Sequence, residues 1–155
     1  RLGAQTAVVA LPIGKEKAFK GVVLLLERKA LVWEKDETGS TFEEVDIPKE
    51  MEAEVEEARA KLVEQISGED DSLTEKYLNG EEAGVEELKK GLRKATIANK
   101  LVPTYCGTSL RNKGDQPVLD GVIDYLPSPL DILMYAELTL KQEKKKSAPT
   151  QKTLL

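Results

Sequence analysis

The chain has 155 residues, of which 40% are apolar, 33% are charged and 5% are aromatic, and its formal net charge is −5. A chain of this length forms one domain, or a small domain with part of another, and its core must be mainly aliphatic because aromatic residues are scarce. It contains no histidine and a single cysteine, Cys106, so it lacks the commonest general base and cannot form an internal disulfide. No apolar run approaches the roughly 18 residues of a membrane-spanning helix.

The first 47 residues predict short strands. Ala7–Leu11 is a brief apolar run, typical of a buried strand. Phe19–Trp33 is rich in strand-forming residues, the polar segment Glu34–Thr41 predicts a turn around its glycine, and Phe42–Ile47 returns as a further strand. Together these segments predict an antiparallel meander, preceded by the end of a helix at Arg1–Ala4.

Three helices are predicted between residues 48 and 100. The first begins near Pro48 and ends at Gly68, and Ser72–Leu78 and Gly84–Lys100 form the second and third. Apolar residues recur every three or four positions along the first helix, which predicts one buried stripe. The stripe consists of Met51, Val55, Ala58, Leu62 and Ile66.

A strand, a polar loop and a helix are predicted after residue 100. Leu101–Cys106 is the strand, Gly107–Gly114 carries mostly small and polar side chains, and the helix begins near Gln116 with Asp115 as its cap. In α/β proteins this arrangement holds a ligand at the carboxyl end of a strand. The apolar spacing of the helix predicts a buried face of Val118, Leu119, Val122, Ile123 and Leu126.

Charge is unevenly distributed along the chain. Between Lys49 and Asp71 there are nine acidic and three basic residues, whereas the tail from Lys141 has five lysines and one glutamate. The acidic residues are gathered in one helix and the basic residues in one tail, so the sequence does not predict a basic surface for nucleic acid. Residues 132–140 are apolar and predict either a helix extension or a strand, and residues 141–155 predict a disordered tail.

The segment Cys106–Pro129 carries the strongest motif of the chain. It reads C-G-T-S-L-R-N-K-G-D-Q, followed by L-D at 119–120, V at 122 and D-Y-L-P-S-P at 124–129. This order and spacing resemble the end of the GTP-binding domain of bacterial-type translation elongation factor G. The upstream phrases L-P-I-G, K-Y-L-N-G-E-E and E-E-L-K-K-G-L-R-K-A-T-I are similar to the same family, whereas Leu24 stands where the family commonly has Asp.

The resemblance implies an α/β fold with α+β character. Residues 1–14 would supply a strand of the GTPase domain, and residues 15–100 an inserted subdomain with a small antiparallel sheet and three helices. Residues 101–131 would supply the last strand, loop and helix of a P-loop GTPase-type domain. Residues 132–155 form a divergent tail in which the resemblance fades.

The resemblance also implies a loop that contacts the base, at Thr108, Ser109 and Leu110, whose backbone N–H groups would face guanine. The alternative, which needs no resemblance, is that this segment is only a polar turn between a strand and a helix. The sequence has no G-x-x-x-x-G-K-[ST] phosphate loop, and the usual magnesium ligand is missing with it. We therefore expect no enzymatic activity, cofactor or metal for this chain, although the full-length parent would use GTP and GDP with magnesium. Asn112–Asp115 fits the string N-K-x-D but lies six residues beyond the strand, so we do not expect it to read guanine.

The acidic helix is the remaining candidate site. The first interpretation is that its acidic side chains simply form a solvent-exposed face. The second, which the resemblance implies, is that this face binds the lysine-rich C-terminal domain of the ribosomal stalk protein. The expected contacts are Glu50, Glu54, Glu57 and Glu64. The chain does not begin with Met, so we expect a piece of a longer protein. The resemblance implies a cytoplasmic fragment of the ribosomal translocase, in bacteria or an organellar matrix. The alternative is a free-standing, non-enzymatic module, derived from a translational GTPase, that binds the ribosome or acts as a decoy. We expect no membrane or direct nucleic-acid partner, and we expect Cys106 to be a buried thiol.

Overall fold

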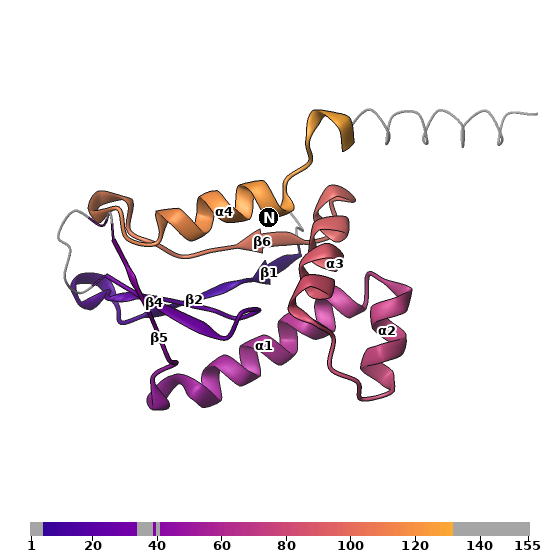
Figure 1. Ribbon diagram of the computed structural model, residues 1–155, viewed down its shortest axis with the longest axis horizontal. Helices are drawn as coiled ribbons and strands as arrows, with labels where there is room; N and C mark the ends of the chain where they lie inside the picture. The colour runs from indigo at the N-terminus through magenta and orange to yellow at the C-terminus, as the bar shows by residue number, and fades with distance from the viewer. Residues whose placement is uncertain (1–4, 34–38, 40, 132–155) are drawn as a thin grey trace, which may run out of the picture.

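The structure, a computed structural model, describes residues 5–33, 39 and 41–131 (Figure 1). The predicted helix end at Arg1–Ala4, most of the predicted turn at 34–41 and the predicted tail from residue 132 lie outside the described residues. Within them the chain forms a two-stranded sheet, a four-stranded sheet and four α-helices. The predicted mixed α/β fold is therefore confirmed.

The two-stranded sheet pairs two strands that lie far apart in the sequence. Strand β1 (Thr6–Val8) pairs in parallel with β6 (Val102–Thr104), in the register that places Thr6 opposite Val102. A parallel pair needs a crossover connection, and here the whole segment between the two strands supplies it. Two neighbouring strands of one sheet are therefore separated in sequence by the meander and three helices.

The four-stranded sheet is an antiparallel meander in chain order. It consists of β2 (Ala10–Ile13), β3 (Gly21–Leu24), β4 (Lys29–Val32) and β5 (Glu43–Val45), with the short 3₁₀ helix η1 (Glu16–Ala18) between β2 and β3. Sequence analysis predicted one strand at Ala7–Leu11, but the structure divides this run between the two sheets. Val9 makes the junction, because its N–H donates to Thr104 and its carbonyl accepts from Leu25, each at 2.9 Å.

The three helices predicted between residues 48 and 100 are confirmed. They are α1 (Glu52–Ser67), which follows the 3₁₀ turn η2 (Lys49–Met51), α2 (Asp71–Leu78) and α3 (Val85–Ile97). The Asp70 side chain caps α2 by accepting from Ser72 N–H at 3.0 Å. None of the helices of the described residues is long and apolar enough to cross a membrane.

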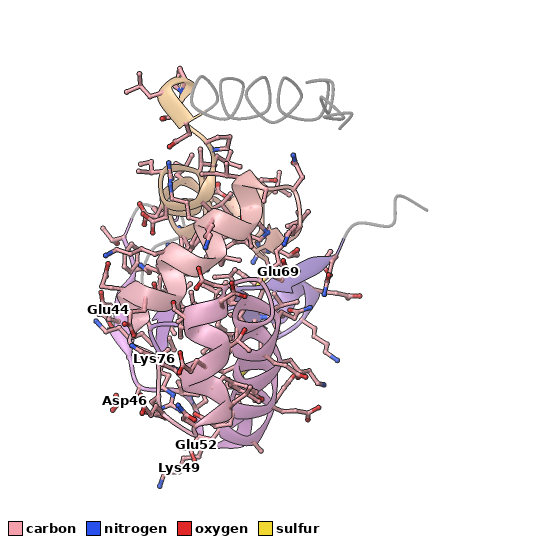
Figure 2. The ribbon with its side chains drawn as sticks, turned by 90° about the vertical axis from the view of Figure 1, so that its right-hand side faces the viewer. Glu44, Asp46, Lys49, Glu52, Glu69 and Lys76 are labelled. Atoms are coloured by element: carbon pink, nitrogen blue, oxygen red, sulfur yellow. The ribbon has the colours of Figure 1, made fainter. Side chains whose placement is uncertain are left out.

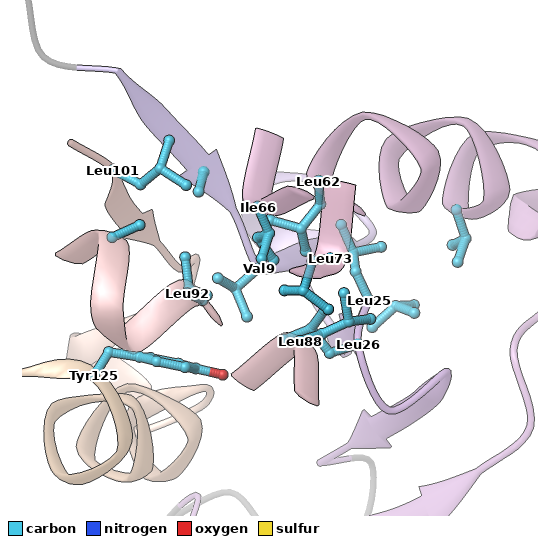
Figure 3. Packing of buried hydrophobic residues seen from close by; sticks show 14 of the residues in the cluster. Val9, Leu25, Leu26, Leu62, Ile66, Leu73, Leu88, Leu92, Leu101 and Tyr125 are labelled. Carbon is cyan, nitrogen blue, oxygen red and sulfur yellow. The ribbon is translucent and has the colours of Figure 1, made fainter. Parts of the chain in front are cut away.

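The main core lies where α1, α2 and α3 meet β1 and β3 (Figure 3). The predicted stripe of α1 supplies Val55, Leu62 and Ile66, all fully buried, while Met51 and Ala58 are partly buried against them. A second core of Ala10, Val22, Leu31 and Trp33 lies within the meander. Because Tyr105 packs against both clusters, the segment after β6 connects them.

Helix α4 (Asp115–Tyr125) runs on the other side of the strands from α1 (Figure 1). Its predicted buried face was wrong: Val118, Leu119, Val122, Ile123 and Leu126 are all exposed, Ile123 to 75%. The helix instead buries Pro117, Gly121 and Tyr125, which recur every four residues. Gly121 allows close approach to Tyr105, since a Cβ at that position would lie 2.6 Å from the Tyr105 hydroxyl.

Candidate functional site

The loop between β6 and α4 has the position that the sequence predicted. Residues Thr108, Ser109 and Leu110 follow the carboxyl end of β6 and lead through the 3₁₀ turn η3 (Ser109–Arg111) into α4. Thr108 and Lys113 exchange two backbone hydrogen bonds, of 2.8 and 3.2 Å, which close the loop on itself. Leu110 at its tip is 94% exposed.

The three loop N–H groups differ in availability. The N–H of Thr108 already donates to the carbonyl of Lys113. The N–H groups of Ser109 and Leu110 have no acceptor among the described residues. The loop as folded can therefore offer two backbone donors to an acceptor such as a carbonyl oxygen of a base.

The meander sheet holds this loop from behind. Lys113 Nζ donates to the Trp33 carbonyl at 2.9 Å, and Gln116 Nε2 donates to the Gly39 carbonyl at 3.0 Å. Gly39 has a positive φ of 71°, and a Cβ there would lie 2.3 Å from the Arg111 carbonyl oxygen, so only glycine fits. Sequence analysis did not find these contacts, because they join positions about 80 residues apart.

Asn112–Asp115 does not have the geometry of a motif at the end of a strand. Asn112, which follows η3 as its C-cap, has a left-handed backbone conformation with φ 51°. Gly114, which precedes α4, is also left-handed, with φ 91°. Asp115 is the first residue of α4 and its side chain makes no capping hydrogen bond, so its predicted role as the cap was wrong. The left-handed Gly114 holds that position because the chain must turn sharply out of the loop there.

Cys106 lies at the base of the loop. Its Sγ is 3.6 Å from the Ala10 carbonyl, and the residue packs against the second core. Burial raises the pKa of the Cys106 thiol, which keeps it in the unreactive protonated form. No group of three or more side chains suited to a metal ion occurs among the described residues.

All four predicted docking glutamates are exposed to solvent. Glu50 lies in η2, and Glu54, Glu57 and Glu64 lie on the outer side of α1. Figure 2 labels other charged residues around this helix: Lys49 and Glu52 lie near its beginning, and Glu69 lies just beyond its end. Glu50, Glu54 and Glu64 form no ion pair within the part of the chain that the structure describes.

Glu57 is the exception on this face. Lys61 lies 2.6 Å from its carboxylate, four residues along the helix, and the hydrogen bond from Lys61 lowers the pKa of Glu57. Three other acids of the region are paired across the fold: Glu56 with Arg28 at 2.9 Å, Glu69 with Lys100 at 2.6 Å, and Asp70 with Lys94 at 2.7 Å. Glu50, Glu54 and Glu64 therefore keep their charge without a basic partner among the described residues.

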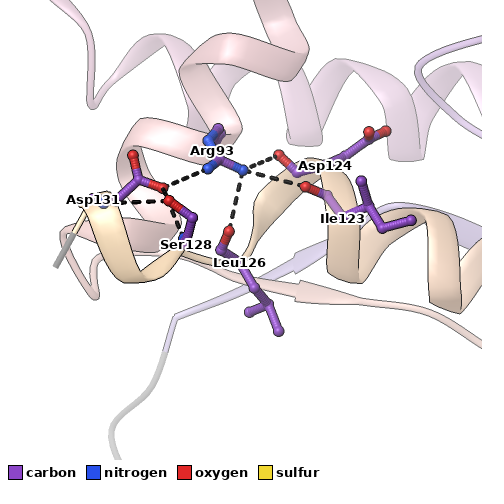
Figure 4. Close-up of polar contacts among 6 residues, drawn as sticks. All are labelled: Arg93, Ile123, Asp124, Leu126, Ser128 and Asp131. Carbon is purple, nitrogen blue, oxygen red and sulfur yellow. Dashed lines mark hydrogen bonds and ion pairs between the residues drawn. The ribbon is translucent and has the colours of Figure 1, made fainter.

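An arginine contact that sequence analysis missed fixes the end of α4. Arg93 of α3 pairs with Asp131 at 2.7 Å, and Asp131 in turn accepts from Ser128 (Figure 4). The hydrogen bonds from Ser128 lower the pKa of Asp131. Arg93 Nη1 also donates to three backbone carbonyls at the end of the helix, those of Ile123, Asp124 and Leu126, at 2.9–3.3 Å.

A second missed feature is a pair of tyrosines between α4 and the sheet. Burial raises the pKa of both hydroxyls, of Tyr105 and of Tyr125, above the ordinary value. Near them Lys89 pairs with Glu27 at 2.7 Å and with Asp124 at 3.5 Å. These contacts attach α4 to α3 and to the meander, so they position the helix that follows the loop.

The sequence matches no protein-family model. The fold matches a crystal structure of a protein from Thermus thermophilus, with a TM-score of 0.69 and 29% sequence identity. The match covers 80% of this chain but 18% of that protein, so this chain spans less than a fifth of its length. The likeness establishes the fold and leaves the activity open.

Proposed function

We propose that this chain is the part of an elongation-factor-G-like translational GTPase that recruits the protein to the ribosomal stalk. The observation that carries the proposal is the exposed acidic face formed by Glu50, Glu54, Glu57 and Glu64, of which only Glu57 has a basic partner among the described residues. A partner with a lysine-rich helix fits this face by charge. Charge complementarity of this kind accelerates encounter and gives binding that weakens as salt is added.

The arrangement of the loop supports the GTPase ancestry. Thr108–Leu110 leave a parallel strand and enter a helix, as a base-contacting loop in an α/β nucleotide-binding fold does. The two free N–H groups, of Ser109 and Leu110, are the donors such a loop would use. Two such contacts contribute about 1–3 kcal/mol, far less than useful nucleotide affinity, so we expect no GTP binding or hydrolysis by this chain.

The exposed apolar face of α4 supports a role as one piece of a larger assembly. Four apolar side chains of α4 and Leu126 at its C-cap are exposed here, whereas parallel sheets and their helices are normally covered on both faces. The match to less than a fifth of a longer protein is consistent with this view. Both observations favour a part of a larger GTPase over a free-standing decoy module.

Titration with the fluorescently labelled C-terminal domain of the stalk protein tests the proposal. We expect saturable binding that weakens when the salt concentration rises from about 0.1 M to 1 M, because the Debye length falls from about 10 Å to 3 Å. Replacing Glu54 and Glu57 together by lysine should weaken binding at least about tenfold. The matched control replaces Glu75 and Glu86, exposed acids of α2 and α3, by lysine and should leave binding unchanged.

The comparison of the two charge-reversed proteins decides the outcome. Both have the same net charge, so a general charge effect would weaken binding equally in each. Equal affinity of the Glu54/Glu57 variant and the wild-type chain would contradict the acidic face as the docking site.

A further inference from the structure

A groove lies along α1, between this helix and helices α2 and α3. Residues 56, 59, 60, 63 and 67 line it from α1, and α2, the loop Gly80–Ala83 and α3 form its other wall. The groove has a volume of about 280 Å³. At about 100° per residue, Arg59 and Val63 lie across the helix from Glu54 and Glu57. We call it the α1–α2 groove.

Two polar groups in this groove are buried without partners. Ser67 is 3% exposed, and its hydroxyl has no hydrogen-bond partner in the described structure. The Nε–H of Arg59 is likewise buried with no acceptor, and its guanidinium forms no ion pair with any described residue. Buried polar groups are nearly always satisfied, and each one left unpaired costs about 1–3 kcal/mol. Two such groups in one groove therefore point to a ligand that would satisfy both.

The chemistry of the groove restricts that ligand. A guanidinium is permanently charged and pairs best with a carboxylate or phosphate. Arg28 at the same end is already engaged by Glu56 at 2.9 Å, so Arg59 is the guanidinium with an unused donor. Glu81 and Glu82 at the rim would repel a multiply charged phosphate. These charges favour a single carboxylate.

The spacing of the two groups requires an elongated ligand. Arg59 and Ser67 are eight residues apart, which is roughly 12 Å of helix rise, so one carboxylate does not bridge both. The surface between them is apolar, formed by Ala60, Val63 and Leu73. A peptide of three or four residues extends about 10–14 Å and carries carbonyl acceptors along its length.

We propose that the α1–α2 groove binds the carboxyl-terminal residues of a partner protein that ends in aliphatic side chains. The terminal carboxylate accepts from Arg59, a backbone carbonyl further back accepts from the Ser67 hydroxyl, and the aliphatic side chains cover Val63 and Leu73. This site is separate from the acidic face, so it stands or falls independently of the proposed function.

The test uses the peptide acetyl-Ala-Ala-Val-Leu with a free carboxylate, titrated into the ¹⁵N-labelled chain and followed by NMR. We expect saturable shifts of the Arg59 Nε–H resonance and of the amides of Ser67 and Leu73, with a roughly millimolar dissociation constant. The same peptide with a terminal carboxamide should bind at least about tenfold more weakly, because it cannot form a charge-assisted pair with the guanidinium. Hexanoate, which has no second acceptor, should bind more weakly than the free-acid peptide, and inorganic phosphate should not compete.

Variants locate the contact. Arg59→Gln should weaken binding of the free-acid peptide at least about tenfold and Ser67→Ala about threefold, whereas Lys61→Gln on the opposite side should change nothing. Several results would overturn the proposal: no saturable shift at about 50 mM peptide, equal affinity for the acid and the amide, competition by phosphate, or full binding to the Arg59→Gln protein. The acid-to-amide comparison needs no variant, so it holds even if a substitution impairs folding.

Discussion

Helices α1 and α4 have similar apolar patterns in sequence, but the apolar stripe of α1 is buried and that of α4 is exposed. The stripe of α1 is covered by α2, α3 and the sheet, and Val55, Leu62 and Ile66 are fully buried. The apolar stripe of α4 faces solvent, and Leu119 is 63% exposed. An amphipathic pattern shows that a face is suited to burial, but a partner must be present to cover it. The helices between residues 48 and 100 cover one another, whereas the outer face of α4 has no partner among the described residues.

The largest expected effect distinguishes these two stripes directly. Leu62→Ala removes a fully buried side chain and should lower the free energy of unfolding by about 2–5 kcal/mol, because it leaves a cavity. Ile123→Ala removes an exposed side chain and should change that energy by no more than about 0.5 kcal/mol. Urea titrations followed by circular dichroism measure both. A cost above about 1.5 kcal/mol for Ile123→Ala would show that the α4 face is covered in solution.

The inner side of α4 should be intolerant of added volume. Gly121→Ala would place a methyl group 2.6 Å from the Tyr105 hydroxyl, whose ring is fixed between two cores. We expect a loss of about 1–3 kcal/mol in urea titrations, as for other overpacked sites. Gly68→Ala is the control, because its Cβ would meet nothing closer than 3.5 Å. Equal stability of the two variants would contradict the packing of α4 on Tyr105.

The Arg93 contact should hold the last turn of α4 rather than the whole chain. Arg93→Gln removes the charge that pairs with Asp131 and the donors to the helix-end carbonyls, and should cost about 1–3 kcal/mol. Arg93→Lys should recover little of this loss, because an ammonium group cannot copy the planar array of donors. Hydrogen exchange should accelerate at residues 122–126 and remain unchanged in α1. Uniform acceleration along the chain would contradict a local role.

The smallest expected effect concerns pH. Hydrogen bonds from Lys94 and Ser72 lower the pKa of Asp70 from 3.8 to about 2. A lowered folded-state pKa adds stability above about pH 4, which is lost as the pH falls toward 2. In Asp70→Asn this part of the acid dependence should disappear, while Glu75→Gln, an exposed acid of the same helix, should retain it. An unchanged acid limb in Asp70→Asn would contradict the ion pair with Lys94.

As with α1 and α4, the elements that the sequence predicts correctly are those whose packing partners lie close in the chain. Local periodicity was sufficient for the three helices between residues 48 and 100, because each has its neighbours within a few dozen residues. The division of Ala7–Leu11 between two sheets depends on Val9, whose partners Leu25 and Thr104 lie far along the chain. The inner face of α4 was missed because glycine and proline carry little apolar signal, although Gly121 is what permits the close packing.

The features of the candidate site also fall into two groups, those that a local sequence pattern predicts and those that depend on long-range contacts. The position of Thr108–Leu110 after a strand, and the exposure of the acidic residues on α1, agree with the pattern in the sequence. The contacts of Lys113 and Gln116 with the meander are long-range, and no local signal announces them. The unpaired groups of the α1–α2 groove appear only when α1 and α2 are packed together.

We propose that this chain has a loop suited to contact a guanine base but has no phosphate-binding site. Titration calorimetry with GDP and magnesium tests this claim most directly. We expect no saturable heat up to about 1 mM nucleotide, because Ser109 and Leu110 offer two backbone donors and the sequence has no phosphate loop. A dissociation constant in the micromolar range would contradict the account, because the chain would then hold a complete nucleotide site.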